Sequence, residues 1–550
     1  LIKLSANWMA ASGSDHEDHE LFNAVKAIGM NLCPELGISI PVGKDSMSMQ
    51  TTWGDDEVKT VTSPLSLVVT AFSESYNINK TLTPQLTLDT ESTLILIDLG
   101  GGKNRMGGSS YNLVNNITNF EVPDLDNPEL IKKFFKGIQF LNKENKLLAY
   151  HDRSDGGLIT TVLEMSFAGH CGIKLELAVK GSIIEFLLNE ELGAVIQVAN
   201  KDITFIKKYL AKDLGLSLIT IGVPTIDHKI SILNDSALVY SSTRSNLQQT
   251  WAETSFRMQA IRDNPKSAEE EFDLILDDSN PGINPKINFK MPSKINISEL
   301  KPKIAILREQ GINGHSEMAA AFNYAGFEAH DVHMSDILNG QKSLKDFNGL
   351  AACGGFSFGD VLGAGEGWAK SILFNNKLRD EFQKFFERKD TITLGVCNGC
   401  QMLSSIKEII PGADLWPKFI KNESEQFEAR FVMVEVTKNN SLFFNGMIGS
   451  VLPVVVSHGE GRVKFSNEER LNLCQSSNLI SLKYVDNYHK GTLMYPMNPN
   501  GSPAGITGLT SSDGRVSIMM PHPERVFRTD QNTWRPKKWE TFGPWYRMFA

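Results

Sequence analysis

The sequence has little of what secreted, membrane-spanning or nucleic-acid-binding proteins require. Only 6 of its 550 residues are cysteine, too few for a disulfide framework in so long a chain, so a reducing cytoplasm is the expected location. No apolar run approaches the roughly 20 residues that cross a bilayer, and no signal peptide is visible. The net charge of -9 argues against nucleic-acid binding. We therefore expect neither a membrane nor a nucleic acid as partner.

The rest of the composition is ordinary for a soluble globular protein. Hydrophobic residues make up 41% and charged residues 22% of the chain. A chain of this length exceeds what one hydrophobic core can serve, so three or four domains are expected. An acidic protein can still bind anionic substrates, because local Lys, Arg and backbone N–H groups hold phosphate.

Changes of pattern divide the chain into four parts and predict a multidomain protein of α/β and α+β class. Residues 1–88 mix helical and strand patterns, and residues 89–228 open with a buried strand at 93–99. Residues 229–302, with one helical stretch at 246–260, are predicted to be a connector. Residues 303–550 alternate apolar strands and helices, which predicts a doubly wound parallel sheet with its sites at the strand C-termini.

The first residues suggest that the chain is part of a longer one. The sequence opens with Leu1 instead of Met, inside a segment that has the pattern of a strand. We therefore expect preceding residues in the same polypeptide.

A thiol stands at a predicted strand-to-helix turn in the last part of the chain. The apolar strand at 393–396 is followed by Cys397 and then by a helical pattern from Cys400. The start of a helix lowers the pKa of such a thiol and exposes its sulfur. Gly395 and Gly399 permit the tight turn, as in the nucleophile elbow of serine hydrolases. Cys397 is therefore the predicted nucleophile.

A thiolate nucleophile needs a base, and the base needs an orienting group. The segment MPHPE at 520–524 supplies both. If it is extended, His522 and Glu524 point to the same side. His522 would take the thiol proton and return it to the leaving group, and Glu524 would fix the tautomer of His522.

An oxyanion hole is predicted where glycine-rich backbone follows another apolar strand. The loop CGGFSFGD at 353–360, with Gly355, and the N–H of Asn398 are the proposed donors. Two other interpretations of Cys397 remain: a redox-active or half-zinc pair with Cys400, and a buried structural cysteine. No second Cys-x-x-Cys or His-x-His completes a zinc site in the sequence.

These motifs resemble the glutaminase domain of the formylglycinamide ribonucleotide amidotransferase family. The resemblance rests on GVCNGCQ at 395–401, GGFSFGD at 354–360, PHPER at 521–525, LREQG at 307–311 and HGEGR at 458–462. It implies a class I glutaminase with Cys397, His522 and Glu524 as its triad, and it assigns Gln401 and the loop that begins with His458 to the glutamine site or an interface. Phe358 stands where many relatives have Tyr.

The first half of the chain resembles the synthetase part of the same family. The segments NWMAA at 7–11, PVGKDSMSM at 41–49 and HDRSDGGL at 151–158 carry this resemblance. It implies a second copy of a two-domain unit like that of aminoimidazole ribonucleotide synthetase. Asp152 would bind Mg²⁺ and Ser154 a nucleotide. An N-capping loop explains Asp152 and Ser154 equally well from local sequence.

A third segment offers phosphate ligands without forming a recognised loop. Lys44 and Ser46 could hold a phosphate of nucleotide or substrate, although the glycine spacing of a Walker A loop is absent and a solvated turn fits as well.

The resemblance implies a ligase that consumes ATP and glutamine, uses Mg²⁺ and converts formylglycinamide ribonucleotide to formylglycinamidine ribonucleotide. It also implies that the first copy of the synthetase unit, the N-terminal half of the polypeptide, precedes this chain. Two alternatives stand beside it: a stand-alone cysteine glutaminase or peptidase-like hydrolase, and a degenerate interaction protein without activity. The synthetase-like residues before the glutaminase disfavour the first, and the intact Cys, His and Glu disfavour the second.

Overall fold

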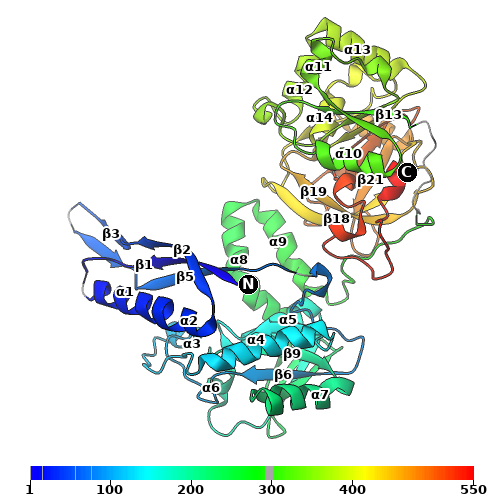
Figure 1. Ribbon diagram of the computed structural model, residues 1–550. Coiled ribbons are helices and arrows are strands. Elements are labelled where there is room, and N and C mark those ends of the chain that lie inside the picture. Colours follow the sequence, from blue (N-terminus) through cyan, green and yellow to red (C-terminus); the bar gives the residue numbers. More distant parts are fainter. Residues whose placement is uncertain (1, 15, 56, 76, 292–300) are drawn as a thin grey trace. The chain divides into compact units, whose positions relative to one another are not determined.

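The computed structural model describes residues 2–14, 16–55, 57–75, 77–291 and 301–550. The chain folds as two compact units, Leu1–Trp251 and Ala252–Ala550, which are described separately (Figure 1). None of the helices in the described ranges is both long enough and apolar enough to cross a bilayer. The end of the predicted connector, residues 292–300, lies outside the described residues.

The first unit begins with a small three-stranded sheet in the order β2-β1-β5. Strand β1 (Lys3–Met9) runs parallel to β2 (Ser39–Ser46) and antiparallel to β5 (Ser66–Phe72). The segment between β1 and β2 is helical, as its periodicity predicts. Its parts are α1 (Glu17–Lys26), a π-helical turn η1 (Ala27–Leu32) and α2 (Cys33–Leu36). A hairpin of β3 (Gln50–Trp53) and β4 (Lys59–Thr62) follows β2.

A seven-stranded sheet forms the core of the first unit, in the order β12-β11-β8-β10-β6-β9-β7. Its strands are β6 (Ser92–Asp98), β7 (Ala149–Asp152), β8 (Gly172–Leu177), β9 (Gly193–Ala199), β10 (Ser217–Thr225), β11 (Lys229–Asn234) and β12 (Ala237–Thr243). The helices and turns between them are α3 (Ser110–Val114), α4 (Pro128–Lys143), α5 (Gly157–Gly169), α6 (Ile183–Leu188), α7 (Ile203–Lys207) and η4 (Lys208–Asp213).

Strand β6 is buried along its whole length because helices cover both faces of the sheet (Figure 1). Leu94 and Leu96 pack with α5 in one apolar cluster. The alternate residues Ile95 and Ile97 pack with α4, α7 and η4 in another. A strand covered on both sides needs apolar residues at every position, which explains why the sequence shows a continuous apolar run here.

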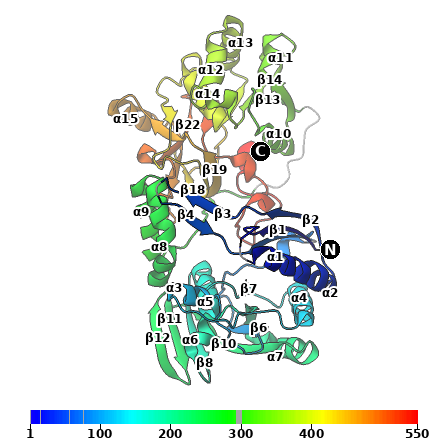
Figure 2. The same ribbon diagram turned by 90° about the vertical axis from the view of Figure 1, so that its left-hand side faces the viewer.

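The start of the predicted connector belongs to the sheet instead. We expected the synthetase-like part to end at residue 228, but β11 pairs in parallel with β8 and β12 continues the ladder. Buried Ile230 and Ile232 alternate with polar residues on β11, the pattern of a half-covered strand. The predicted helix at 246–260 is confirmed as α8 (Arg244–Arg262), and α9 (Pro265–Asp273) follows it (Figure 2).

The second unit is built on a nine-stranded sheet in the order β14-β13-β15-β16-β23-β22-β21-β18-β19. Its strands are β13 (Lys303–Arg308), β14 (Glu328–His333), β15 (Gly349–Ala352), β16 (Ile392–Val396), β18 (Glu428–Val436), β19 (Val451–His458), β21 (Ile480–Val485), β22 (Ile506–Thr510) and β23 (Val516–Met519). The first five strands in the sheet are parallel, and the other four continue it antiparallel.

Helices fill the connections of the parallel half, as the predicted doubly wound fold requires (Figure 1). They are α10 (His315–Tyr324), α11 (Met334–Leu338), α12 (Glu366–Leu373), α13 (Asn376–Glu387) and α14 (Asn398–Ser405). The remaining elements of this unit are α15 (Glu468–Ser476), α16 (Tyr546–Phe549) and a two-stranded sheet of β17 (Lys418–Ile420) and β20 (Arg462–Lys464). Two helices, α12 and α13, fill the connection between β15 and β16, and they end and begin on either side of residues 374–375.

A buried ion pair ties the loops at one end of the seven-stranded sheet together. Arg153 donates from Nη2 to Asp98 Oδ1 at 2.6 Å, and both side chains are almost fully buried. The same guanidinium donates to the carbonyl oxygens of Glu191 at 2.6 Å and Leu192 at 2.9 Å. Removing one partner from such a pair leaves a buried charge uncompensated.

We predict that Arg153→Met lowers the free energy of unfolding of the first unit by about 3–5 kcal/mol, the usual cost of breaking a buried pair from one side. Lys174→Met is the matched control in the same unit, because Lys174 pairs with Glu176 on β8 with both side chains about half exposed, and exposed pairs contribute little. Urea unfolding measures both variants. Equal and small effects would show that the Arg153 pair is not what holds these loops.

Candidate functional site

Strand β16 and helix α14 meet at Cys397 in the sharp turn that the sequence predicts. The residue has φ 53° and ψ -111°, an unusual conformation for a non-glycine residue. A Cβ on Gly399 would lie 2.0 Å from the carbonyl oxygen of Ala352, and one on Gly395 would lie 2.5 Å from Leu403 Cδ1. Both positions therefore have to be glycine for the helix to start so close to the sheet. Such strain is typical of functional residues.

His522 and Glu524 reach the same edge of the sheet from the end of β23. Val396 pairs with Met519 in the ladder of β16 and β23, so the residues that follow the two strands are neighbours. His522 Nδ1 and Glu524 Oε1 are 2.6 Å apart, and both side chains are buried. We considered this segment as extended from its sequence, but it is not: Pro523 begins a 3₁₀ turn, η10 (Pro523–Arg525). The turn nevertheless brings the carboxylate to the ring.

The histidine changes the ionisation of the thiol. Burial opposes ionisation of Cys397, but the charge and hydrogen bonding of His522, together with a hydrogen bond from His458, lower the pKa of Cys397 to about 6. Burial likewise disfavours the imidazolium, and Glu524 and the thiolate outweigh it and raise the pKa of His522 to about 10. Between these values the two side chains form a thiolate–imidazolium pair. The neighbouring Cys400 behaves oppositely, since burial raises its pKa well above that of a free thiol.

The predicted glycine-rich loop lies directly against this pair. A Cβ on Gly354 would lie 2.8 Å from His522 Cε1 and 3.3 Å from Cys397 Cβ. Gly355 has φ 153°, and a Cβ there would lie 2.5 Å from Ile312 Cα. Further along, Phe358 and Asp360 both have φ 53°. A backbone held this close to the thiol and this strained can present N–H groups to a developing oxyanion.

Polar side chains of α14 connect the loop to the segment after β19. Asn398 Nδ2 donates to Asp360 Oδ1 at 3.0 Å, and Gln401 Nε2 donates to the carbonyl oxygen of Glu460 at 2.6 Å. Burial, with a further contribution from Glu460, raises the pKa of Asp360. The structure therefore brings the predicted residues Gly355, Asn398 and Gln401 to the surroundings of Cys397.

His458, the last residue of β19, is 3% exposed. Its Nε2 lies 2.8 Å from Asn500 Nδ2. The carbonyl oxygen of the residue before it, Ser457, lies 3.7 Å from Cys397 Sγ. Asn500 was not predicted from the sequence. A single asparagine about forty positions after the HGEGR motif at 458–462 forms no recognisable pattern with it.

The predicted nucleotide and metal residues lie in the first unit. Asp152 ends β7 and is exposed, and its Oδ1 accepts a hydrogen bond from the Tyr150 hydroxyl. Burial, with this bond, raises the pKa of Tyr150. Ser154 follows in the turn that leads into α5, where its carbonyl oxygen accepts from Gly157 N–H at 2.9 Å. Sequence reasoning missed Glu190, which accepts from the N–H groups of Gly156 and Ser110, each at 2.8 Å.

Lys44 and Ser46 lie on β2, in the three-stranded sheet. Ser46 Oγ donates to Asn7 Oδ1 at 3.3 Å, and Lys44 is exposed. Within the described residues, no hydrogen bond or ion pair joins Lys44 or Ser46 to the turn of Asp152 and Ser154. The two predicted phosphate-binding segments are thus separate features of the first unit.

The side chains near Asp152 fit a Mg²⁺ ion that takes most of its ligands from phosphate and water instead of from the protein. Among the residues that the structure describes, no three His, Cys, Asp or Glu side chains cluster closely enough to hold a metal ion. Mg²⁺ in nucleotide enzymes needs one or two carboxylates, with phosphate oxygens and water completing its shell. Asp152, exposed before a helix start, meets that smaller requirement.

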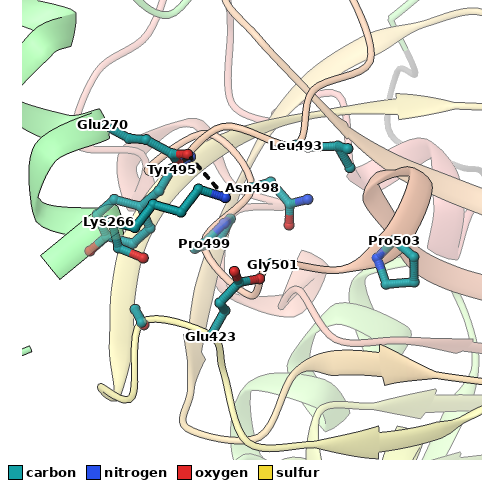
Figure 3. Close-up of a pocket in the computed structure, with 11 residues that line it drawn as sticks. Lys266, Glu270, Glu423, Leu493, Tyr495, Asn498, Pro499, Gly501 and Pro503 are labelled. Atoms are coloured by element: carbon teal, nitrogen blue, oxygen red, sulfur yellow. Dashed lines mark hydrogen bonds and ion pairs between the residues drawn. The ribbon is translucent and has the colours of Figure 1, made fainter. Parts of the chain in front are cut away.

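A pocket of about 210 Å³ lies elsewhere in the second unit, between α9 and the loops after β17 and β21 (Figure 3). Lys266 and Glu270 of α9 line one side, and Glu423 and Tyr495 line others. Neither Cys397 nor His522 lines it. Three of its lining residues, Glu423, Pro499 and Gly501, are sequence neighbours of Asn422 and Asn500.

Comparison with solved structures gives partial matches. PurLQS from Thermotoga maritima is 24% identical, with a TM-score of 0.35, and the match covers 46% of this chain and 96% of that chain. T. maritima PurL complexed with ATP is 10% identical, with a TM-score of 0.32; the match covers 44% of this chain and 37% of that chain. T. maritima PurL complexed with FGAR is 12% identical, with a TM-score of 0.32, and 44% and 39% are covered.

Family models match three parts of the chain. An FGAR-AT PurM_N-like domain matches residues 1–74, and the C-terminal domain of AIR synthase related proteins matches residues 91–222. A CobB/CobQ-like glutamine amidotransferase domain matches residues 301–550 and so includes Cys397, His522 and Glu524. Together these matches support the predicted resemblance to the formylglycinamide ribonucleotide amidotransferase family. The predicted fold is confirmed: an AIR-synthase-like part is followed by a glutamine amidotransferase domain.

The pKa values predict how the amidotransferase thiol reacts with iodoacetamide. Cys397 should be alkylated with a pH midpoint near 6, because its thiolate persists down to that pH. Cys400, three residues away on α14, is the internal control and should stay unmodified at neutral pH. Peptide mass spectrometry after timed labelling from pH 5 to 9 separates the two thiols. A midpoint for Cys397 near that of a free cysteine would contradict the ion pair.

Proposed function

We propose that this chain supplies ammonia from glutamine to a synthetase that converts formylglycinamide ribonucleotide to formylglycinamidine ribonucleotide with ATP. The observation that carries the proposal is the buried set of Cys397, His522 and Glu524 at the C-terminal edge of the parallel strands. A thiolate, a protonated base and an orienting carboxylate are what amide cleavage requires.

The proposed steps follow from the protonation states. The Cys397 thiolate attacks the side-chain amide carbon of glutamine, and the oxyanion is held by N–H groups of the loop at 354–355 and of Asn398. As the C–N bond breaks, His522 gives its proton to the leaving nitrogen, which departs as ammonia. Water then attacks the thioester, His522 takes a proton from the water, and glutamate leaves with the thiolate restored. Glu524 holds the ring throughout and stabilises the imidazolium.

Two carboxyl groups near the thiol suit the amino-acid end of glutamine. The carboxylate of Asp360 accepts a hydrogen bond from the Asn398 side chain. The backbone carbonyl of Glu460 accepts one from the Gln401 side chain, which fixes the position of Glu460. Glu460 Oε2 also accepts from Ala364 N–H at 3.1 Å. We propose that these carboxyl groups face the substrate's α-ammonium group.

We predict that Cys397→Ala abolishes glutamine-dependent synthesis in the enzyme that contains this chain, while ammonia-dependent synthesis persists. The thiol serves only the release of ammonia, so an external supply of ammonia should bypass it. Cys400→Ala is the matched control and should retain glutamine-dependent activity, because that thiol stays protonated. Glutamate and formylglycinamidine ribonucleotide are measured with each nitrogen source. Loss of both activities in Cys397→Ala alone would refute the assignment.

In the first unit we propose that Asp152 holds Mg²⁺ and that the turn at Ser154 holds a nucleotide phosphate. Lys44 and Ser46 are proposed as further phosphate ligands. The start of α5 supplies N–H groups for an anion, and a bound Mg²⁺ would neutralise charge on the phosphates. The chain's own contribution is to fix the loop, since Glu190 holds the N–H of Gly156 and Arg153 anchors the strand end.

Asp152→Asn should weaken binding of Mg²⁺·ADP by about tenfold or more, since the carboxylate proposed to hold Mg²⁺ is lost. Asp235→Asn is the matched control: Asp235 is exposed in the turn between β11 and β12, with φ 48°, a conformation that Asn tolerates. Isothermal titration with ADP, with and without Mg²⁺, measures the effect. Equal affinity of both variants for Mg²⁺·ADP would remove Asp152 from the site.

A further inference from the structure

A chain of buried amide hydrogen bonds ends on the second histidine beside the thiol. Asn422 Nδ2 donates to the carbonyl oxygens of His458 at 2.8 Å and Gln426 at 3.0 Å. Its Oδ1 accepts from Gly461 N–H at 2.9 Å. Backbone groups on both sides therefore fix which end of the Asn422 amide is oxygen.

Asn500 is oriented in turn by Asn422. Its Nδ2 donates to Asn422 Oδ1 at 2.8 Å, and its Oδ1 accepts from the Tyr484 hydroxyl at 2.5 Å. Burial raises the pKa of Tyr484, so this hydroxyl keeps its proton and donates it. Asn500 and Tyr484 are both fully buried. A flipped Asn500 would set two amide oxygens against each other.

The second hydrogen of the Asn500 amide points at His458. Nδ2 of Asn500 and Nε2 of His458 are 2.8 Å apart, and a nitrogen that faces an N–H donor has to be an acceptor. The proton of neutral His458 is therefore on Nδ1. Within the described residues, this buried atom makes no hydrogen bond that meets the geometric limits, so it is free to face the sulfur. The next residue back, Ser457, is the one whose carbonyl oxygen contacts Cys397 Sγ.

We propose that His458 is a positioning residue whose Nδ1–H donates to the Cys397 thiolate, with its tautomer fixed by Asn500 and Asn422. This inference rests on the proposed glutaminase and deepens it, because it gives the thiolate a neutral donor in addition to the charged His522. His458 then cannot act as a base, since its basic nitrogen is occupied by Asn500. Its hydrogen bond is among the causes that lower the pKa of Cys397.

The other groups that face the thiol are accounted for. The titratable side chains that interact with Cys397 are His522, His458, Cys400 and Tyr484, with Glu524 behind His522. His522 carries the positive charge, and Cys400 and Tyr484 remain protonated because burial raises their pKa values. His458 is thus the neutral side chain in this set that has an N–H available for the sulfur.

The test is the pH dependence of Cys397 alkylation by iodoacetamide in His458→Leu, His458→Asn and the unchanged protein. His458→Leu should raise the midpoint by about one pH unit, which makes alkylation below pH 6 about tenfold slower. His458→Asn places an amide N–H near the position of Nδ1 and should restore most of the shift. Midpoints that stay within experimental error of the unchanged protein in both variants would overturn the proposal.

Kinetics separate this role from a contact to glutamine. In the enzyme that contains this chain, His458→Leu should lower kcat for glutamine about tenfold and leave KM nearly unchanged. A raised KM with an unchanged alkylation midpoint would make His458 a glutamine-binding residue and refute the proposal. Alkylation does not depend on the substrate, so a shifted midpoint in a protein that never cleaves glutamine would refute the proposed function alone.

A variant that does not touch the thiol gives an independent check. Asn500→Leu removes the N–H that fixes the tautomer, so it should raise the alkylation midpoint in the same direction as His458→Leu. This variant decides the matter if His458→Leu does not fold. An Asn500→Leu protein with a lowered melting temperature but the original midpoint would show a merely structural role and count against the proposal.

Discussion

The turn at Cys397 is the constraint on which the rest of the second unit depends. A non-glycine residue with φ 53° and ψ -111° has to be held in place by its surroundings. Gly395 and Gly399 let β16 and α14 approach, and β23 beside β16 delivers His522. This arrangement places the sulfur at the start of a helix and at the edge of the sheet where the parallel strands end.

Burial and charge act against each other at this turn. A buried thiolate is costly, and the charge and hydrogen bonding of His522, with a hydrogen bond from His458, offset the cost. Glu524 in turn stabilises the charged ring of His522. In the proposed arrangement two asparagines and a tyrosine fix the tautomer of His458. The imidazolium between the thiolate and the carboxylate keeps the nucleophile ionised in a buried site.

The sequence predicted residues whose roles are tied to local patterns. Cys397, His522 and Glu524 were identified because a strand, a glycine turn and a His-Pro-Glu segment are visible in short windows. The 3₁₀ turn at Pro523 was not predicted, because an extended segment would also bring the side chains of His522 and Glu524 together. Asn422 and Asn500 were missed because a partner that acts through a backbone-anchored amide has no spacing rule. Strands β11 and β12 were missed because a half-covered edge strand resembles a polar connector.

In the proposed reaction, glutamine passes through a thioester on Cys397. Rapid acid quenching of the enzyme during turnover of glutamine, followed by mass spectrometry of the peptide that contains residues 395–401, detects this intermediate directly. We expect a γ-glutamyl adduct on Cys397 that disappears with hydroxylamine treatment and is absent when glutamine is replaced by ammonia. Steady release of glutamate with no adduct on this peptide, or with the adduct on Cys400, would contradict it.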